Sequence, residues 1–115
     1  VVILENELLG KPKNLAEAHE MLQKLSAKTH QVITGVTLKS NRKIQSFSEV
    51  TRVTFQELTP SEITYYLSQY QPLDKAGSYG IQEWIGGIGM KNIEGCFYNV
   101  MGLPTSRLFQ ELKSF

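Results

Sequence analysis

Two neighbouring stretches of alternating side chains constrain this fold more than any other feature of the chain. The first runs from His30 to Lys39 and the second from Ile44 to Glu57. Apolar or β-branched residues recur at every second position, the period of a strand with one buried face. Residues 40–43 between them are turn-forming, so the pattern predicts a long antiparallel hairpin. The side chains predicted to share a face are Val32, Thr34, Val36 and Leu38 on the first strand and Phe47, Glu49, Thr51, Val53 and Phe55 on the second.

A helix is expected on the N-terminal side of this hairpin. Asn14, followed three positions later by Glu17, has the spacing of a helix start. Apolar residues then recur at steps of three and four, which predicts one buried stripe and a helix over Asn14–Lys28. The stripe consists of Leu15, Ala18, Leu22 and Leu25.

Two further helices are expected after the hairpin. Thr59–Glu62 contains a capping box, with Thr as the cap, Pro at the first helical position and Glu completing the box. This helix should end near Gln71, and Pro104 should open the last one. The predicted inward residues are Ile63, Tyr66, Leu67 and Tyr70 on the first of these helices and Leu108, Leu112 and Phe115 on the second.

Shorter apolar runs at both ends of the chain predict two more strands. Val1–Leu4 has the continuous apolar character of a buried strand, and Glu5–Glu7 turns the chain after it. Ile93–Val100 is a second such run. The 115 residues contain no internal repeat and no Ser/Gly-rich linker, so we expect a single domain over residues 1–115, of a mixed α/β (α+β) class.

The composition excludes several classes of protein. A net charge of +1 provides no bulk attraction for a nucleic acid polymer, so an anionic ligand would need a local basic site. No apolar run approaches the roughly 18 residues of a membrane span, and no signal peptide is visible, which favours a cytoplasmic protein. Cys96 is the single cysteine, so neither an intramolecular disulfide nor a cysteine-based metal site is expected. Since neither histidine is near it in sequence, a structural thiol is favoured over a nucleophile.

The segment 72–82 is the best candidate for a binding loop. It places Asp74 and Lys75 side by side, with Gln82 after a run of small residues. A carboxylate suits a divalent metal, an ammonium balances phosphate charge, and an amide can read the edge of a base because it donates and accepts in one plane. The alternative for Asp74 and Lys75 is an ordinary solvated loop.

Two other charged residues are candidates for the same site. Lys11 lies between Gly10 and Pro12, which biases it to an extended conformation from which it can reach a phosphate. Its alternative is a solvated surface lysine. Glu49 shares a face with apolar neighbours, which places it either at the end of the sheet or in a polar site. No metal-ligand cluster, nucleophile elbow or P-loop motif is present in the sequence.

Four segments, in the same order along the chain, carry a resemblance to one family. They are Leu9–Pro12 (LGKP), Thr29–Val36 (THQVITGV), Asp74–Gln82 (DKAGSYGIQ) and Ile93–Pro104 (IEGCFYNVMGLP). In these segments the chain resembles the Maf nucleotide pyrophosphatases. The resemblance implies an inosine-triphosphatase-like fold, a mixed twisted sheet flanked by helices around a cleft.

The resemblance also implies an activity and roles for the candidate residues. Members of the family hydrolyse nucleoside triphosphates to the monophosphate and pyrophosphate with a divalent metal, Mg²⁺ or Mn²⁺, as cofactor. By motif, Lys11 would contact phosphate and Gln82 would set base specificity, in a pattern that resembles the branch acting on dTTP and UTP. Asp74, Lys75 and Glu49 would bind substrate within the cleft. The residues that hold the metal are not indicated.

The sequence departs from the family pattern at its beginning. In that pattern a basic phosphate loop and a general-base Asp precede the position of Val1, so this chain resembles the C-terminal 60% or so of the family domain. The alternatives are therefore an enzyme seen in part, an inactive nucleotide-binding remnant or truncated fragment, and a structural interaction module. An exposed sheet edge would also favour a homodimer, strand swapping or aggregation.

The position of the general base gives a first prediction. We expect the 115-residue chain alone to release little or no pyrophosphate from dTTP or UTP with Mg²⁺ or Mn²⁺, because the carboxylate that activates water would lie ahead of Val1. A pyrophosphate-release assay measures this directly. Robust turnover would show that the base lies within these 115 residues.

Overall fold

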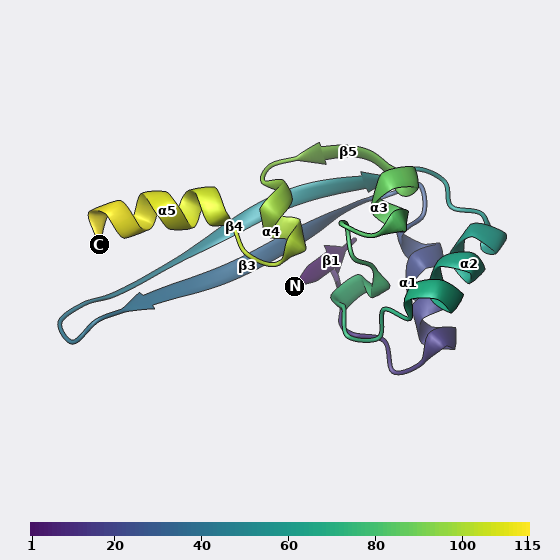
Figure 1. Ribbon diagram of the computed structural model, residues 1–115, viewed down its shortest axis with the longest axis horizontal. Coiled ribbons are helices and arrows are strands. Elements are labelled where there is room, and N and C mark those ends of the chain that lie inside the picture. The colour runs from purple at the N-terminus through teal and green to yellow at the C-terminus, as the bar shows by residue number, and fades with distance from the viewer.

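The computed structural model describes residues 1–115 as one five-stranded sheet with helices packed around it (Figure 1). The strand order is β2-β1-β3-β4-β5, and every pair is antiparallel. The mixed α+β class is therefore confirmed. The strands are β1 (Val2–Leu4), β2 (Glu7–Leu9), β3 (Thr29–Lys39), β4 (Ile44–Phe55) and β5 (Met90–Glu94). The helices are α1 (Leu15–Leu25), α2 (Pro60–Tyr70), the 3₁₀ turn η1 (Ala76–Ser78), α3 (Trp84–Gly89), α4 (Phe97–Met101) and α5 (Thr105–Ser114).

The long hairpin predicted from the alternating pattern is confirmed. β3 and β4 pair from Thr29 opposite Thr54 to Lys39 opposite Ile44, and Ser40 closes the turn by donating to Lys43 O at 2.8 Å. The even positions of β3 and the odd positions of β4 face inward, as expected. The outer half of the hairpin projects as an arm away from the core, with α5 alongside it, and the whole molecule measures 52 × 27 × 26 Å (Figure 1).

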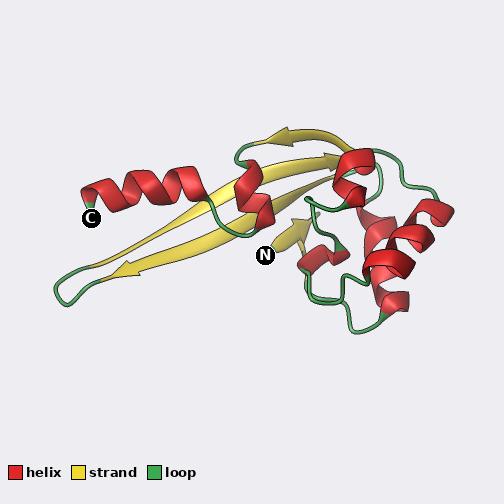
Figure 2. Cartoon of the chain, in the orientation of Figure 1, coloured by secondary structure: helices red, strands yellow, loops and turns green.

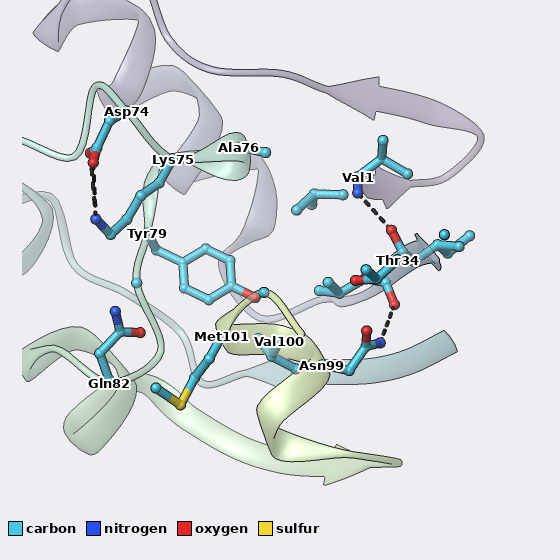
Figure 3. Close-up of a pocket in the computed structure, with 16 residues that line it drawn as sticks. Val1, Thr34, Asp74, Lys75, Ala76, Tyr79, Gln82, Asn99, Val100 and Met101 are labelled. Atoms are coloured by element: carbon cyan, nitrogen blue, oxygen red, sulfur yellow. Dashed lines mark hydrogen bonds and ion pairs between the residues drawn. The ribbon is translucent and has the colours of Figure 1, made fainter. Parts of the chain in front are cut away.

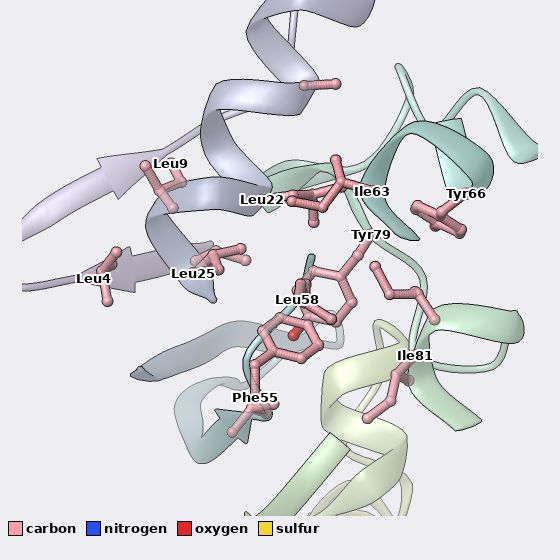
Figure 4. Close-up of a cluster of buried hydrophobic side chains, with 14 of the residues drawn as sticks. Leu4, Leu9, Leu22, Leu25, Phe55, Leu58, Ile63, Tyr66, Tyr79 and Ile81 are labelled. Atoms are coloured by element: carbon pink, nitrogen blue, oxygen red, sulfur yellow. The ribbon is translucent and has the colours of Figure 1, made fainter. Parts of the chain in front are cut away.

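The hydrophobic core lies at the other end of the sheet, where α1 and α2 gather (Figure 2). Sixteen buried apolar residues form one cluster there, and the inward ends of β3 and β4 contribute to it. The aromatic members Phe55, Tyr66 and Tyr79 are among its largest side chains (Figure 4). None of the helices has the length and apolar character needed to cross a bilayer.

Both predicted helix starts are confirmed by their hydrogen bonds. The Asn14 side chain accepts from Glu17 N at 2.9 Å. At Thr59 the capping box is complete, because the hydroxyl accepts from Glu62 N while the Glu62 carboxylate accepts from Thr59 N. These local bonds satisfy backbone donors that a helix start leaves free, so both helices begin where the sequence places them.

Two short elements near the N-terminus and after α2 were not expected from the sequence. Glu5 and Asn6 both take left-handed φ values, 49° and 66°, and join β1 to β2 in a two-residue hairpin. The glycine-rich segment after Gln82 forms the helix α3. Both elements are too short to leave a periodic pattern in the sequence.

The strand predicted over Ile93–Val100 is wrong. β5 ends at Glu94, Gly95 turns the chain with a φ of 120°, and Phe97–Met101 is helical. A side chain on Gly95 would lie 3.1 Å from the backbone of Thr51, so the turn crosses β4 closely. The helical turn then places the side chain of Asn99 against the carbonyl groups of the sheet, a contact that an extended segment would not make in the same position.

The last helix is confirmed, and its predicted inward face is confirmed in part: Leu108 and Phe115 are half-buried, whereas Leu112 is exposed. No residue of α5 is buried, and Leu112 is 52% exposed. The helix lies along the projecting arm and contacts it mainly through polar groups. Gln45 donates to Glu111, and the Arg107 guanidinium lies 5.1 Å from the centre of the Phe47 ring.

Two neighbouring glycines of α3 give a matched stability prediction. A Cβ on Gly86 would lie 1.7 Å from Ile81 O, whereas a Cβ on Gly87 would meet nothing within 4 Å. Gly86→Ala should therefore lower the free energy of unfolding by about 2 kcal/mol or more, since backbone must move. Gly87→Ala should raise it by up to about 1 kcal/mol through helix propensity. Urea unfolding of both variants measures this, and equal effects would contradict the close packing of α3 on Ile81.

Candidate functional site

The largest cavity of the molecule, about 510 Å³, lies between the sheet and the loop after α2 (Figure 3). The start of β1 and the middle of β3 form one wall. The loop 74–82 forms another, and α4 closes the third side through residues 99–102. Half of the sixteen lining residues are hydrophobic, which is typical of a ligand site with a few placed polar groups.

The loop is held in shape by an unusual backbone path. Gly77 and Ser78 both have left-handed φ values, 73° and 68°. Gly77 N donates to Gly10 O at 3.1 Å, and a side chain on Gly77 would press on Val2 at 3.2 Å. Only glycine accommodates both the conformation and the contact. The tight turn directs the polar residues on either side of it to the same cavity.

Three of the predicted site residues meet at this cavity. Asp74, Lys75 and Gln82 all line it. Lys75 Nζ lies 3.4 Å from Asp74 Oδ1, and the carboxylate is far more exposed than the lysine, 77% against 27%. An ion pair this exposed contributes little to stability, so the ammonium remains available to an anion in the cavity.

The other two predicted site residues do not line the cavity. Lys11 is exposed on the segment after β2 and does not line the cavity. It follows Gly10, whose carbonyl oxygen accepts from Gly77 N of the loop. Glu49 lies in mid-strand opposite Thr34, not at the end of the sheet. Its carboxylate has no hydrogen bond or ion pair within the chain, while its backbone oxygen accepts from Asn99 Nδ2 at 3.2 Å. Their roles in the site stay predictions.

Sequence reasoning missed Asn99 as an individual site residue. Its side chain is fully buried, and Nδ2 donates to Val32 O, Glu49 O and Thr51 Oγ1 at 3.0–3.2 Å. Thr51 gives its own proton to Cys96 O, so Thr51 Oγ1 can only accept from Asn99. Three acceptors around one nitrogen fix the orientation of the amide, and Asn99 Oδ1 has no partner in the chain.

Asn99 borders the cavity, and its Oδ1 is a buried acceptor that no donor of the chain satisfies. Figure 3 shows Asn99 and Val1 on one side of the Tyr79 ring and Lys75 and Gln82 on the other. The sequence signal that could have identified Asn99 is its position as a single polar residue within the apolar run after Gly95. A polar side chain inside such a run requires hydrogen-bond partners.

Tyr79 forms the floor of the cavity and ties it to the sheet. Its hydroxyl lies 2.7 Å from His30 Nε2, and its ring meets those of His30 and Phe55 edge-on. Burial lowers the pKa of His30 to about 4 and raises the pKa of Tyr79. Both side chains are therefore neutral near pH 7, which suits a stable floor better than acid–base chemistry.

The residues around the cavity do not provide a complete set of ligands for a divalent metal. No group of three or more His, Cys, Asp and Glu side chains is placed to hold a metal ion. Asp74 is the only carboxylate that lines the cavity, and it is paired with Lys75. The metal implied by the family resemblance therefore remains a prediction, and no chemical step is derived through it.

The fold and the cavity define an α+β protein with a partly apolar site that carries one ammonium, one carboxylate and two amide groups. Comparison with known families shows to which family the chain belongs. The sequence model of the family described as "Maf-like protein" matches residues 1–115, the whole chain. This chain belongs to the Maf family, as its four ordered motifs predict.

Several curated relatives are similar over nearly the whole chain. A "dTTP/UTP pyrophosphatase" of Phocaeicola vulgatus is 58% identical over 113 residues, which are 98% of this chain and 58% of that protein. Proteins of the same name from Porphyromonas gingivalis and Flavobacterium psychrophilum are each 54% identical, over 100% and 95% of this chain and 58% and 56% of their own lengths. The chain thus spans less than two thirds of the length of these relatives.

The buried His30 predicts a pH dependence of stability. The unfolded chain protonates this histidine near pH 6.5 and the folded chain only near pH 4, so the unfolded state binds more protons between these values. The free energy of unfolding should therefore fall as the pH drops from 6.5 toward 4, by up to about 1.4 kcal/mol per pH unit. Urea unfolding at a series of pH values measures the slope.

His30→Gln should flatten this dependence, because glutamine keeps a polar partner for Tyr79 but does not titrate. His19→Gln, at the half-buried histidine of α1, is the matched control and should retain the slope. Parallel curves for the wild type and His30→Gln would show that another group causes the loss of stability.

Proposed function

We propose that this chain forms the base- and phosphate-recognition part of a nucleoside triphosphate pyrophosphatase that acts on dTTP and UTP. The observation that carries the proposal is that Lys75 and Gln82, which suit phosphate and base, line one cavity. The printed names of the three relatives support the substrate class. The products would be the nucleoside monophosphate and pyrophosphate.

Gln82 is proposed to read the base. Its side-chain amide offers a donor and an acceptor in one plane. Uracil and thymine present the acceptor O4 beside the donor N3–H, which complements that pair in one orientation of the amide, whereas cytosine presents the reverse order and requires the amide turned over. The Tyr79 ring and the apolar side chains of α4 that line the cavity supply a surface for the flat base.

Lys75 is proposed to balance the charge of the triphosphate, with Asp74 holding its ammonium at the edge of the cavity. Lys11 would reach phosphate only if the triphosphate extends past the loop toward Gly10, because its side chain lies outside the cavity wall. Asn99 Oδ1 accepts and does not donate, so any substrate group that meets it must be a donor such as a sugar hydroxyl.

In the proposed reaction, water attacks the α-phosphorus, the α–β bridging bond breaks, and pyrophosphate leaves with the electron pair. The family resemblance puts the carboxylate that accepts the water proton ahead of Val1. The register supports this position. Val2 pairs with Val32 and Val1 bonds with Ile33, so the next residue upstream would lie opposite Thr34, which lines the cavity. Divalent metal, homodimer and cytoplasmic location stay predictions of the family resemblance and the sequence.

An inactive nucleotide-binding remnant is the second candidate, and it is favoured by the absence of a second cavity-lining carboxylate in these residues. Binding and hydrolysis separate the two candidates. An enzyme binds dTTP and releases pyrophosphate once the N-terminal segment of a relative is joined ahead of Val1. A remnant binds dTTP but releases no pyrophosphate, either alone or joined to that segment.

The base-reading role predicts the effect of Gln82→Glu. The carboxylate accepts but does not donate, so it cannot pair with O4, and the preference for a uracil over a cytosine nucleotide should fall roughly tenfold. Calorimetric binding of UTP and CTP analogues with an NH group in place of the α–β bridging oxygen measures the preference. Inorganic triphosphate should still bind.

Gln69→Glu is the control for added charge, because Gln69 is exposed on α2 and does not line the cavity. It should leave the preference between the two analogues at the wild-type value. An unchanged preference in Gln82→Glu would remove Gln82 from base recognition.

A further inference from the structure

The turn that carries Gln82 is held from behind by a buried tyrosine of α2. The Tyr66 hydroxyl accepts from Gly80 N at 3.1 Å and donates to Glu83 Oε1 at 2.6 Å. Glu83 N also donates to Gly80 O at 3.0 Å and closes the turn. One hydroxyl therefore contacts both ends of the four-residue turn that contains Gln82.

The same contacts reach Lys75. Gly80 has no side chain, and a Cβ there would lie 2.7 Å from both Glu83 Oε1 and Lys75 Cε. These two atoms are therefore separated by at most twice 2.7 Å, so the carboxylate of Glu83 lies beside the stem of Lys75. A negative charge at this position favours the ammonium on that side of the loop.

The hydroxyl of Tyr66 is itself fixed by packing. The residue is fully buried, and its ring stacks on Tyr70 with 5.1 Å between ring centres. Burial first, and then the hydrogen bond to Glu83, raise the pKa of Tyr66, so the hydroxyl keeps its proton and its donor role near pH 7. Tyr66 does not line the cavity, so it acts only through the groups that it holds.

We propose that Tyr66 and Glu83 are positioning residues that set the base selectivity of the cavity. They hold the Gly80–Glu83 turn so that the backbone from which Gln82 projects keeps a fixed position beside the stem of Lys75. The inference rests on the proposed function, because it requires Gln82 to read the base and Lys75 to meet phosphate. A fixed donor–acceptor pair discriminates between bases, whereas a mobile one adapts to either.

The test compares two tyrosines of the same helix. Tyr66→Phe keeps the ring and removes the hydroxyl. Tyr65→Phe is the matched control, because the Tyr65 side chain is 49% exposed, packs on Trp84 and makes no hydrogen bond through its hydroxyl. Affinities for the imido analogues of UTP and CTP are measured calorimetrically, and amide exchange at Gly80 is followed by NMR.

Tyr66→Phe should reduce the preference for the UTP analogue about tenfold, with a much smaller change in the affinity for inorganic triphosphate. Gly80 amide exchange should become at least tenfold faster. Tyr65→Phe should match the wild type in both measurements. A purely structural role would lower stability without changing the ratio of the two affinities.

A second pair of variants decides the case if Tyr66→Phe does not fold. Glu83→Gln keeps an oxygen acceptor for the Tyr66 hydroxyl and should keep the preference within about threefold of wild type. Glu83→Ala removes the acceptor and should lose most of the preference. Equal preferences in these two variants would overturn the inference.

The failure of this inference differs from failure of the proposed function. If the wild-type chain shows no preference between the two analogues, the proposed function is wrong and the inference is wrong with it. If the wild type discriminates, and Tyr66→Phe discriminates as well as Tyr65→Phe, the inference alone is overturned.

Discussion

The ladder between β3 and β4 is the interaction on which the rest of this structure depends. The two strands pair along their whole lengths, whereas β1 and β2 have only three residues each. Strands this short have no stability of their own. β1 adds to β3 through Val2 and Ile3, and β5 adds to the inward end of β4. The helices then cover a surface that the hairpin provides.

The cavity takes its shape from the same hairpin. Asn99 bonds α4 to Val32 O on β3 and to Glu49 O on β4. Tyr79 attaches the loop to His30 on β3 and packs on Phe55 of β4. Two walls of the cavity that are distant in sequence are therefore both bonded to the same rigid pair of strands. This holds their relative positions and gives a preorganised site.

Local signals predicted the elements whose cause is local. The hairpin followed from the alternation of His30–Lys39 and Ile44–Glu57, and the starts of α1 and α2 followed from the caps Asn14 and Thr59. The β5–α4 boundary was missed, because the apolar run over Ile93–Val100 has no period that separates a buried strand from a short buried helix. The contact of Gly95 with Thr51 decides it, and that contact spans more than forty positions.

The sequence by itself determined the long hairpin, the helix starts and, through four ordered motifs, the family to which the chain belongs. It also selected Asp74, Lys75 and Gln82, because their chemistry and spacing are written in one short loop. Only the tertiary structure decided that these three face one cavity with Asn99, that Lys11 and Glu49 lie outside it, and that Tyr66 holds the loop from behind. The physical reason is that caps and alternation act between near neighbours, whereas a cavity depends on packing between segments that the chain separates.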